Sequence, residues 1–182
     1  MMLVLLGGGA LIAVFRANPP PLTRGASVGE HWHTSYKIYI CGKRITNYPT
    51  VEGEIHSHGD GFMHIHPSTP AASGVNANVR TFLLLYETSL TQTPDGKNQL
   101  SFPDGSMYTD GDKCPDDGKR YDLTMRNKGK KVGGELGAFI MHDGDAVEIA
   151  FGPKGEKTMK NPYSKAKGIK DVGKGTGTPA PG

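Results

Sequence analysis

The stretch Ile55–Pro67, with the sequence IHSHGDGFMHIHP, holds two His-x-His pairs on either side of a Gly-Asp-Gly segment. A third pair lies upstream, so six of the seven histidines of the chain occur in such pairs. The paired residues are His31, His33, His56, His58, His64 and His66. Neutral imidazole is a common ligand of zinc, copper and nickel, so this pattern predicts a metal site.

The connection between the two downstream pairs decides whether their imidazoles share a face. Asp60-Gly61 is a strong signal for a two-residue hairpin turn, and that turn would send the two pairs to opposite faces. A loop of three or five residues centred on Gly61 would bring all four rings to one face. In that register His58 lies opposite His64, and His56 lies opposite His66.

The apolar residues of the same stretch favour the second register. Ile55, Met63 and Ile65 share one parity, and they share a face only when the two pairs converge. A slip of one residue would turn some of them to solvent. We therefore expect an apolar face toward the core and a four-histidine face outward.

A site of this kind has several forms and one alternative. Four protein ligands make a closed structural site, whereas three ligands and a water make a catalytic one. The nearby carboxylates Glu30, Glu54 and Asp60 are candidates to orient a ring or act as a base. Alternatively, the histidines only bond the backbone at the surface, or form a patch that responds to pH.

Composition points to a small, turn-rich core. The chain of 182 residues is 36% hydrophobic and contains 26 glycines and 13 prolines, which argues against a helical bundle. We predict an α+β fold with a small mixed sheet, one main helix and many turns. The expected strands are 36–41, 121–125 and 146–151, and Ile55–His66 is the expected hairpin.

Two segments are harder to assign from their patterns. Residues 76–90 place Val79, Phe82 and Leu83 at helical spacing, so they are the main helix candidate, with a strand as the alternative. Residues 91–119 are dominated by Pro, Asp and Gly, and we expect a long loop of successive turns there.

The only two cysteines are Cys41 and Cys114, and they lack the spacing of a redox or zinc motif. In an oxidising compartment they would form one disulfide that closes a long loop. In a reducing compartment they would remain free thiols, so the N-terminal segment decides between the two states.

Four segments are expected along the chain. Residues 1–17 form an apolar membrane anchor or signal segment, 18–28 a Pro-rich spacer, and 29–152 the His-rich domain. Residues 153–182 form a basic tail that carries seven lysines and two acidic residues. We expect an extracytoplasmic location, periplasmic or extracellular. Charge in the domain is balanced, so it is not expected to bind nucleic acid.

The motif His56-x-His58-Gly59-Asp60-Gly61-x-x-His64-Ile65-His66-Pro67, with the upstream pair, resembles an uncharacterised family of membrane-anchored bacterial proteins. The resemblance covers residues 29–152 and implies no particular activity. Residues 134–152 resemble the last segment of β-grasp proteins such as sulfur carriers, which implies a β-grasp-like sheet. The terminal Gly-Gly of the carriers is missing, so their chemistry is not expected.

Taken together, these features predict a membrane-tethered, extracytoplasmic module that binds a zinc or copper ion. Its role would be that of an accessory or structural subunit within a larger assembly of proteins. One alternative is a metalloenzyme with three histidines and an open position. The other is a metal-free interaction subunit that uses Trp32 and the basic tail. No nucleophile elbow, phosphate loop or dinucleotide fingerprint occurs in the sequence.

Overall fold

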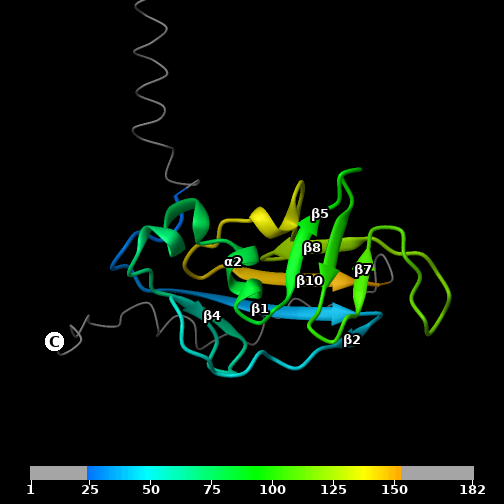
Figure 1. Cartoon of the computed structure of the whole chain (residues 1–182), viewed down its shortest axis with the longest axis horizontal. Helices are drawn as coiled ribbons and strands as arrows, with labels where there is room; N and C mark the ends of the chain where they lie inside the picture. The colour runs from blue at the N-terminus through cyan, green and yellow to red at the C-terminus, as the bar shows by residue number, and fades with distance from the viewer. Residues whose placement is uncertain (1–23, 153–182) are drawn as a thin grey trace, which may run out of the picture.

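A computed structural model describes residues 24–152 as two β-sheets, one α-helix and three short 3₁₀ helices (Figure 1). The larger sheet contains β1 (Trp32–Ile40), β2 (Lys43–Arg44), β3 (Ile55–His56), β4 (Phe62–Ile65), β8 (Leu123–Asn127), β9 (Lys130–Val132) and β10 (Ala146–Phe151). The smaller contains β5 (Ser89–Gln92), β6 (Asn98–Ser101) and β7 (Met107–Thr109). The helices are η2 (Pro70–Ala72), η3 (Gly74–Asn76), α2 (Val79–Leu84) and η4 (Leu136–Ala138).

The larger sheet is mixed. Its strands follow the order β3-β4-β1-β10-β8-β9, and β2 also pairs with β1. The central neighbours β1 and β10 run parallel, and the other pairs are antiparallel. Among the described residues, the first and the last strand thus lie parallel at the centre of the sheet. The predicted α+β class with one main helix is thereby confirmed.

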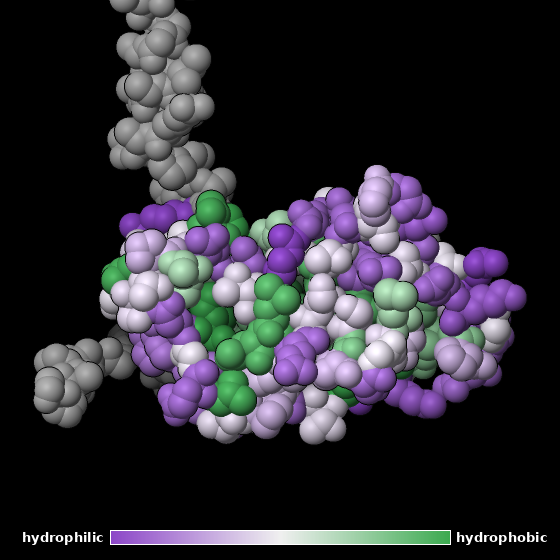
Figure 2. All heavy atoms as spheres, viewed as in Figure 1, coloured by the Kyte–Doolittle hydropathy of each residue, from purple (hydrophilic) through white to green (hydrophobic). Residues whose placement is uncertain are grey.

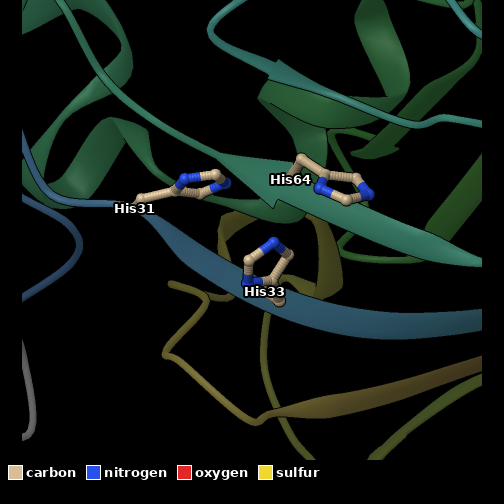
Figure 3. Close-up of side chains that lie close together, drawn as sticks. All are labelled: His31, His33 and His64. Carbon is tan, nitrogen blue, oxygen red and sulfur yellow. The ribbon is translucent and has the colours of Figure 1, made fainter. Parts of the chain in front are cut away.

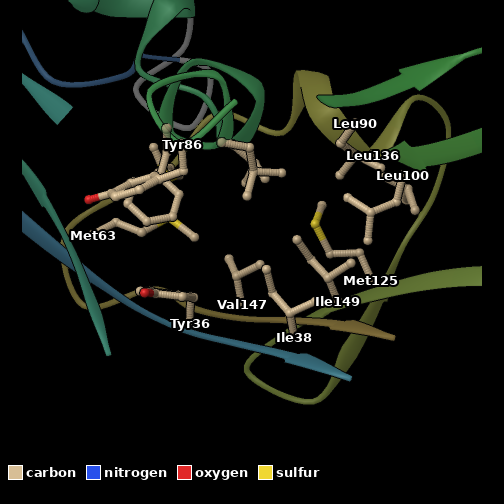
Figure 4. Packing of buried hydrophobic residues seen from close by; sticks show 14 of the residues in the cluster. Tyr36, Ile38, Met63, Tyr86, Leu90, Leu100, Met125, Leu136, Val147 and Ile149 are labelled. Atoms are coloured by element: carbon tan, nitrogen blue, oxygen red, sulfur yellow. The ribbon is translucent and has the colours of Figure 1, made fainter. Parts of the chain in front are cut away.

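The hydrophobic core lies on one face of the larger sheet (Figure 4). Helix α2 contributes Phe82 and Leu83, and the smaller sheet contributes Leu90 and Leu100, all four fully buried. They pack against the side chains of β1 and β10. The side chains buried in these two strands include Tyr36, Ile38, Val147 and Ile149.

The opposite face of the sheet carries the histidines. In β4, Met63 and Ile65 are fully buried in the core, while His64 lies between them in sequence. Successive side chains of a strand point to opposite faces, so His64 must project away from the core. The same alternation turns His33 outward, because Thr34 is fully buried.

The main helix is shorter than predicted. The expected segment 76–90 contains α2 over only six residues, and Asn78 caps it by accepting a hydrogen bond from the Thr81 N–H at 3.0 Å. Glu87 then has a positive φ of 53°, which ends any helical path. Leu90, the last residue of the expected segment, belongs to β5, and its buried side chain enters the core from the smaller sheet.

The turn-rich segment 91–119 is not one long loop, so that prediction was wrong. Strands β6 and β7 lie within it, and β5, which begins just before it, completes a three-stranded antiparallel sheet with them. The predicted turns do occur, since Gly96 and Gly105 have positive φ values between these strands. The strands were missed because their apolar positions are few, with Leu100 alone fully buried in β6.

The disulfide links the end of β1 to the segment between β7 and β8. Cys41, at the end of β1, is bonded to Cys114 in the loop before β8, with a Cα–Cα distance of 5.6 Å. The bond encloses the segments that contain β2 to β7. Disulfides persist in oxidising compartments, so the bond is typical of an extracytoplasmic protein.

The outer surface of α2 remains partly apolar. Figure 2 shows hydrophobic surface near the centre of the face on which Figure 1 places this helix. Leu84 and Leu85 are 55% and 39% exposed. Within residues 24–152, no helix is both long and apolar enough to cross a membrane. The predicted anchor 1–17, most of the spacer 18–28 and the tail 153–182 lie outside the described residues.

Candidate metal centre

Two histidines from distant parts of the sequence face each other across neighbouring strands. His33 of β1 and His64 of β4 are direct cross-strand partners, and their ring centroids lie 4.8 Å apart. His31 precedes β1 by one residue, and its ring centroid is 4.6 Å from that of His33. The pairing of β1 with β4 therefore brings an upstream pair beside a downstream one.

These three histidines form a group that can hold a metal ion. One nitrogen from each of His31, His33 and His64 lies within 4.8 Å of the other two. Figure 3 shows the three rings grouped together, with the ring of His33 below and between those of His31 and His64. Ligand nitrogens on one tetrahedral ion with bonds of ~2.0–2.1 Å are about 3.4 Å apart, so small side-chain rotations would close the group around an ion.

Asp60 orients the ring of His64. The Nε2 atom of His64 lies 2.9 Å from Oδ2 of Asp60, and the other carboxylate oxygen accepts the Phe62 N–H at 3.0 Å. An ionised carboxylate only accepts hydrogen bonds, so Nε2 carries the proton and Nδ1 keeps its lone pair. A carboxylate bonded to the remote nitrogen of a histidine is the usual support of a metal ligand.

A second aspartate fixes the backbone of His33. The N–H of His33 donates to Oδ1 of Asp143 at 2.9 Å, and its carbonyl accepts the Gly144 N–H at 2.8 Å. Asp143 also opposes the lowering of the pKa of His31 and His33. Nothing local in the Asp143-Gly144-Asp145 sequence, which reads only as a turn, shows that β1 passes alongside.

All six paired histidines lie on one face and form a closed ring of contacts, which we call the histidine ring. It runs through His31, His33, His64, His58, His56 and His66 and returns to His31. Successive ring centroids are 4.6, 4.8, 4.3, 4.6, 4.7 and 5.5 Å apart. The expected convergence of the hairpin pairs is therefore observed.

The register within the hairpin differs from the prediction by two residues. His56 pairs with His64, and Ile55 pairs with Ile65, whereas His66 had been expected opposite His56. A shift of two residues preserves the face of every side chain, so the four rings still converge. The parity of the apolar residues fixes the face but not the pairing, since either register keeps Ile55 and Ile65 in the core.

Ser57, between His56 and His58, anchors this side of the ring to the core. Ser57 is fully buried, and its N–H donates to the hydroxyl oxygen of Tyr86 at 2.8 Å. Burial raises the pKa of Tyr86, so the phenol stays protonated at neutral pH. Because Ser57 points inward, its two neighbours are directed outward. Nothing in the local sequence pattern assigns Ser57 or Tyr86 a role in the site.

Burial favours the neutral form of four of the six ring histidines. Burial lowers the pKa of His31, His33, His56 and His64, and neighbouring imidazoles lower it further. Asp60 opposes this effect at His64, through its hydrogen bond and its charge, without reversing it. Neutral imidazole is the form that binds a metal ion, so these four side chains are prepared for ligation near pH 7.

The remaining candidates have other partners. Glu54 accepts hydrogen bonds from Ser68 and Thr69, while Glu30 is paired with Arg24. Neither carboxylate is bonded to an imidazole among the described residues. His142, the one histidine outside the His-x-His pairs, is half-buried and stacks on Trp32 with a centroid distance of 6.1 Å.

Comparison with known proteins gives no relative to which a function can be traced. No protein family, no curated protein and no solved structure matches the chain. The geometry of the histidine ring therefore carries the functional conclusion.

Proposed function

We propose that this protein is a membrane-tethered, extracytoplasmic module that binds a zinc or copper ion. The ligands are His31, His33 and His64, and the role is metal handling or structural support as an accessory subunit of a larger assembly. Three imidazoles converge from β4, from β1 and from the residue before β1, and Asp60 presets one of them; this is the observation that carries the proposal.

The donor set favours a particular class of metal. Imidazole nitrogens suit zinc, copper(II) and nickel, whereas magnesium and calcium prefer oxygen ligands. The His31 side of the group is exposed, so an ion held there remains accessible from solvent. This accessibility fits a module that receives or passes on an ion better than one that encloses it.

Other features support the location. The disulfide is typical of an oxidising compartment, and the apolar segment 1–17 together with the resemblance to membrane-anchored proteins supports a tether. The lysine-rich segment 153–182 supports contact with protein partners or other acidic surfaces.

Elemental analysis of the full chain, purified without a histidine tag, tests the metal centre. We expect zinc or copper to copurify with the protein and to be removed by a chelator. After chelation, the His31→Asn/His33→Asn variant should no longer rebind an ion at this centre. The His142→Asn variant is the matched control, because it removes a histidine outside the ring.

Two results would count against the proposed centre. One is a wild-type metal content below roughly a tenth of an equivalent of any transition metal, together with an unchanged far-ultraviolet circular dichroism spectrum. The other is full retention of bound metal in the double variant. The first result would leave the metal-free interaction role as the better interpretation, whereas the second would show that the metal is bound by other ligands.

A catalytic use of the same ion is the second candidate. Three protein ligands leave a fourth position in which zinc can bind and activate water. A catalytic role would also need a base for that water. Asp60 and Asp143, however, already accept hydrogen bonds from the backbone and the imidazole groups of the site. Zinc-dependent ester hydrolysis that disappears in the His31→Asn/His33→Asn variant would favour this role, and hydrolysis at the rate of free zinc would exclude it.

A further inference from the structure

The other side of the histidine ring contains a second convergence of nitrogen atoms. Nε2 of His56 and Nε2 of His58 lie 3.0 Å apart. Their rings are almost perpendicular, with an angle of 83° between the planes. Neither residue belongs to the group formed by His31, His33 and His64.

Hydrogen bonding determines which nitrogen of His56 is free. Its Nδ1 atom is 2.7 Å from the carbonyl oxygen of Gly53, which can only accept a hydrogen bond. Nδ1 therefore carries the proton, and the Nε2 lone pair points at His58. Two lone pairs cannot face each other at this distance without a proton or a cation between them.

The spacing also suits two ligands of one ion. With bonds of ~2.0 Å, two nitrogens 3.0 Å apart subtend an angle of about 97° at the metal. This angle lies between the right angle of a tetragonal copper(II) site and the tetrahedral angle of zinc. An ion can thus replace the bridging proton once the two rings rotate so that both lone pairs point at it.

The backbone presets this arrangement. Ser57 is fully buried and bonded to Tyr86, so the peptide that joins the two rings is held by the core. His58 itself is exposed, which leaves room for water to complete the coordination of an ion. Nε2 of His66 lies 3.1 Å from Nδ1 of His56, on the side away from this pair.

We infer that the histidine ring holds two divalent transition metal ions, the second one bound by Nε2 of His56 and Nε2 of His58. His64 separates the two positions, because its ring contacts those of both His33 and His58. This inference extends the proposed function but rests on different ligands, so an experiment can reject either metal position without rejecting the other.

Titration of the chelator-stripped full chain with copper(II) and with zinc tests the inference, with isothermal calorimetry and elemental analysis as readouts. We expect two equivalents in the wild type, the second weaker because it has fewer protein ligands. The exposed residue His58 allows the His58→Asn variant to fold, and it should bind one equivalent. The His31→Asn/His33→Asn variant should retain the other, and His142→Asn should bind both.

Each remaining outcome overturns one of the two ideas. One equivalent in the wild type that survives in His58→Asn excludes the second ion and leaves the proposed centre intact. One equivalent that survives in His31→Asn/His33→Asn but is lost in His58→Asn supports the new position and excludes the proposed centre. Loss of all metal in both variants, with normal circular dichroism spectra, shows one site shared by the whole ring and excludes two ions.

Discussion

The N–H of Ser57 donates a hydrogen bond to the hydroxyl oxygen of Tyr86, at 2.8 Å, beneath the outward-facing histidines. Both residues are buried, and they lie 29 positions apart in the sequence. Ser57 also accepts the Gly59 N–H through its side chain, at 3.2 Å. A contact inside the core thus fixes the backbone that presents His56 and His58 to solvent.

Removal of that hydroxyl is expected to destabilise the protein. Tyr86→Phe leaves the buried Ser57 N–H without its acceptor, which should lower the free energy of unfolding by about 1–3 kcal/mol. Urea denaturation of the metal-free protein measures the change. Tyr108→Phe is the control, since no hydrogen bond of its hydroxyl occurs within residues 24–152, and its effect should stay within about 0.5 kcal/mol. Equal effects of the two variants would refute the anchoring role.

The support that Asp60 gives to His64 predicts an effect on metal affinity. Asp60→Asn keeps an oxygen for the Phe62 N–H but loses the charged partner of Nε2, so zinc or copper affinity should fall about 10- to 100-fold. Asp104→Asn is a matched control, because Asp104 accepts the Ser106 N–H in the same type of turn, away from any histidine. Competition with a chromophoric chelator gives both affinities. Unchanged affinity in Asp60→Asn would refute the supporting role of Asp60.

The lowered pKa values of the ring histidines set the direction of the pH dependence. Unfolded imidazoles have a pKa near 6.5, above the folded values of His31, His33, His56 and His64. Below that pH the unfolded state binds more protons, so the free energy of unfolding falls as pH decreases through the folded values. Above about pH 7 these groups contribute no pH dependence.

Urea denaturation of metal-free protein from pH 8 to pH 5 checks this sign. The His31→Asn/His33→Asn variant should lose less stability over the acid part of that range, because two of the four shifted groups are gone. A wild-type stability that increases on acidification would contradict the lowered pKa values of these four histidines. Metal affinity should decrease over the same acid range, because protons compete for the ligand nitrogens.

The disulfide is expected to make a large contribution to stability. Cys41 and Cys114 are separated by 73 residues, and in the chain-entropy model a loop of this size contributes about 4 kcal/mol. The Cys41→Ser/Cys114→Ser variant should unfold at correspondingly lower urea concentration. A phosphine reductant should destabilise the wild type and leave the variant unchanged. If the reductant affects both equally, its action does not proceed through this bond.

Local sequence patterns predicted much of the fold. The alternation in Ala146–Phe151 gave the strand β10 with its observed bounds, and helical spacing located Val79, Phe82 and Leu83 on one buried helix face. The helix was predicted too long because Leu90 continues the apolar pattern, although its side chain enters the core from a strand. Burial by distant segments overrides local propensity at such positions.

The sequence by itself determined that the hairpin histidines share a face, because a strand has a period of two and Ile55, Met63 and Ile65 must be buried together. The tertiary structure decided which imidazoles meet. Pairing of β1 with β4 placed His33 beside His64. The hydrogen bond between Ser57 and Tyr86 anchors the segment that carries His56 and His58, and β3 pairs with β4 in a register two residues from the expected one. The His33–His64 and Ser57–Tyr86 contacts join residues 29 or more positions apart, and local periodicity contains no information on which distant segments will pack together.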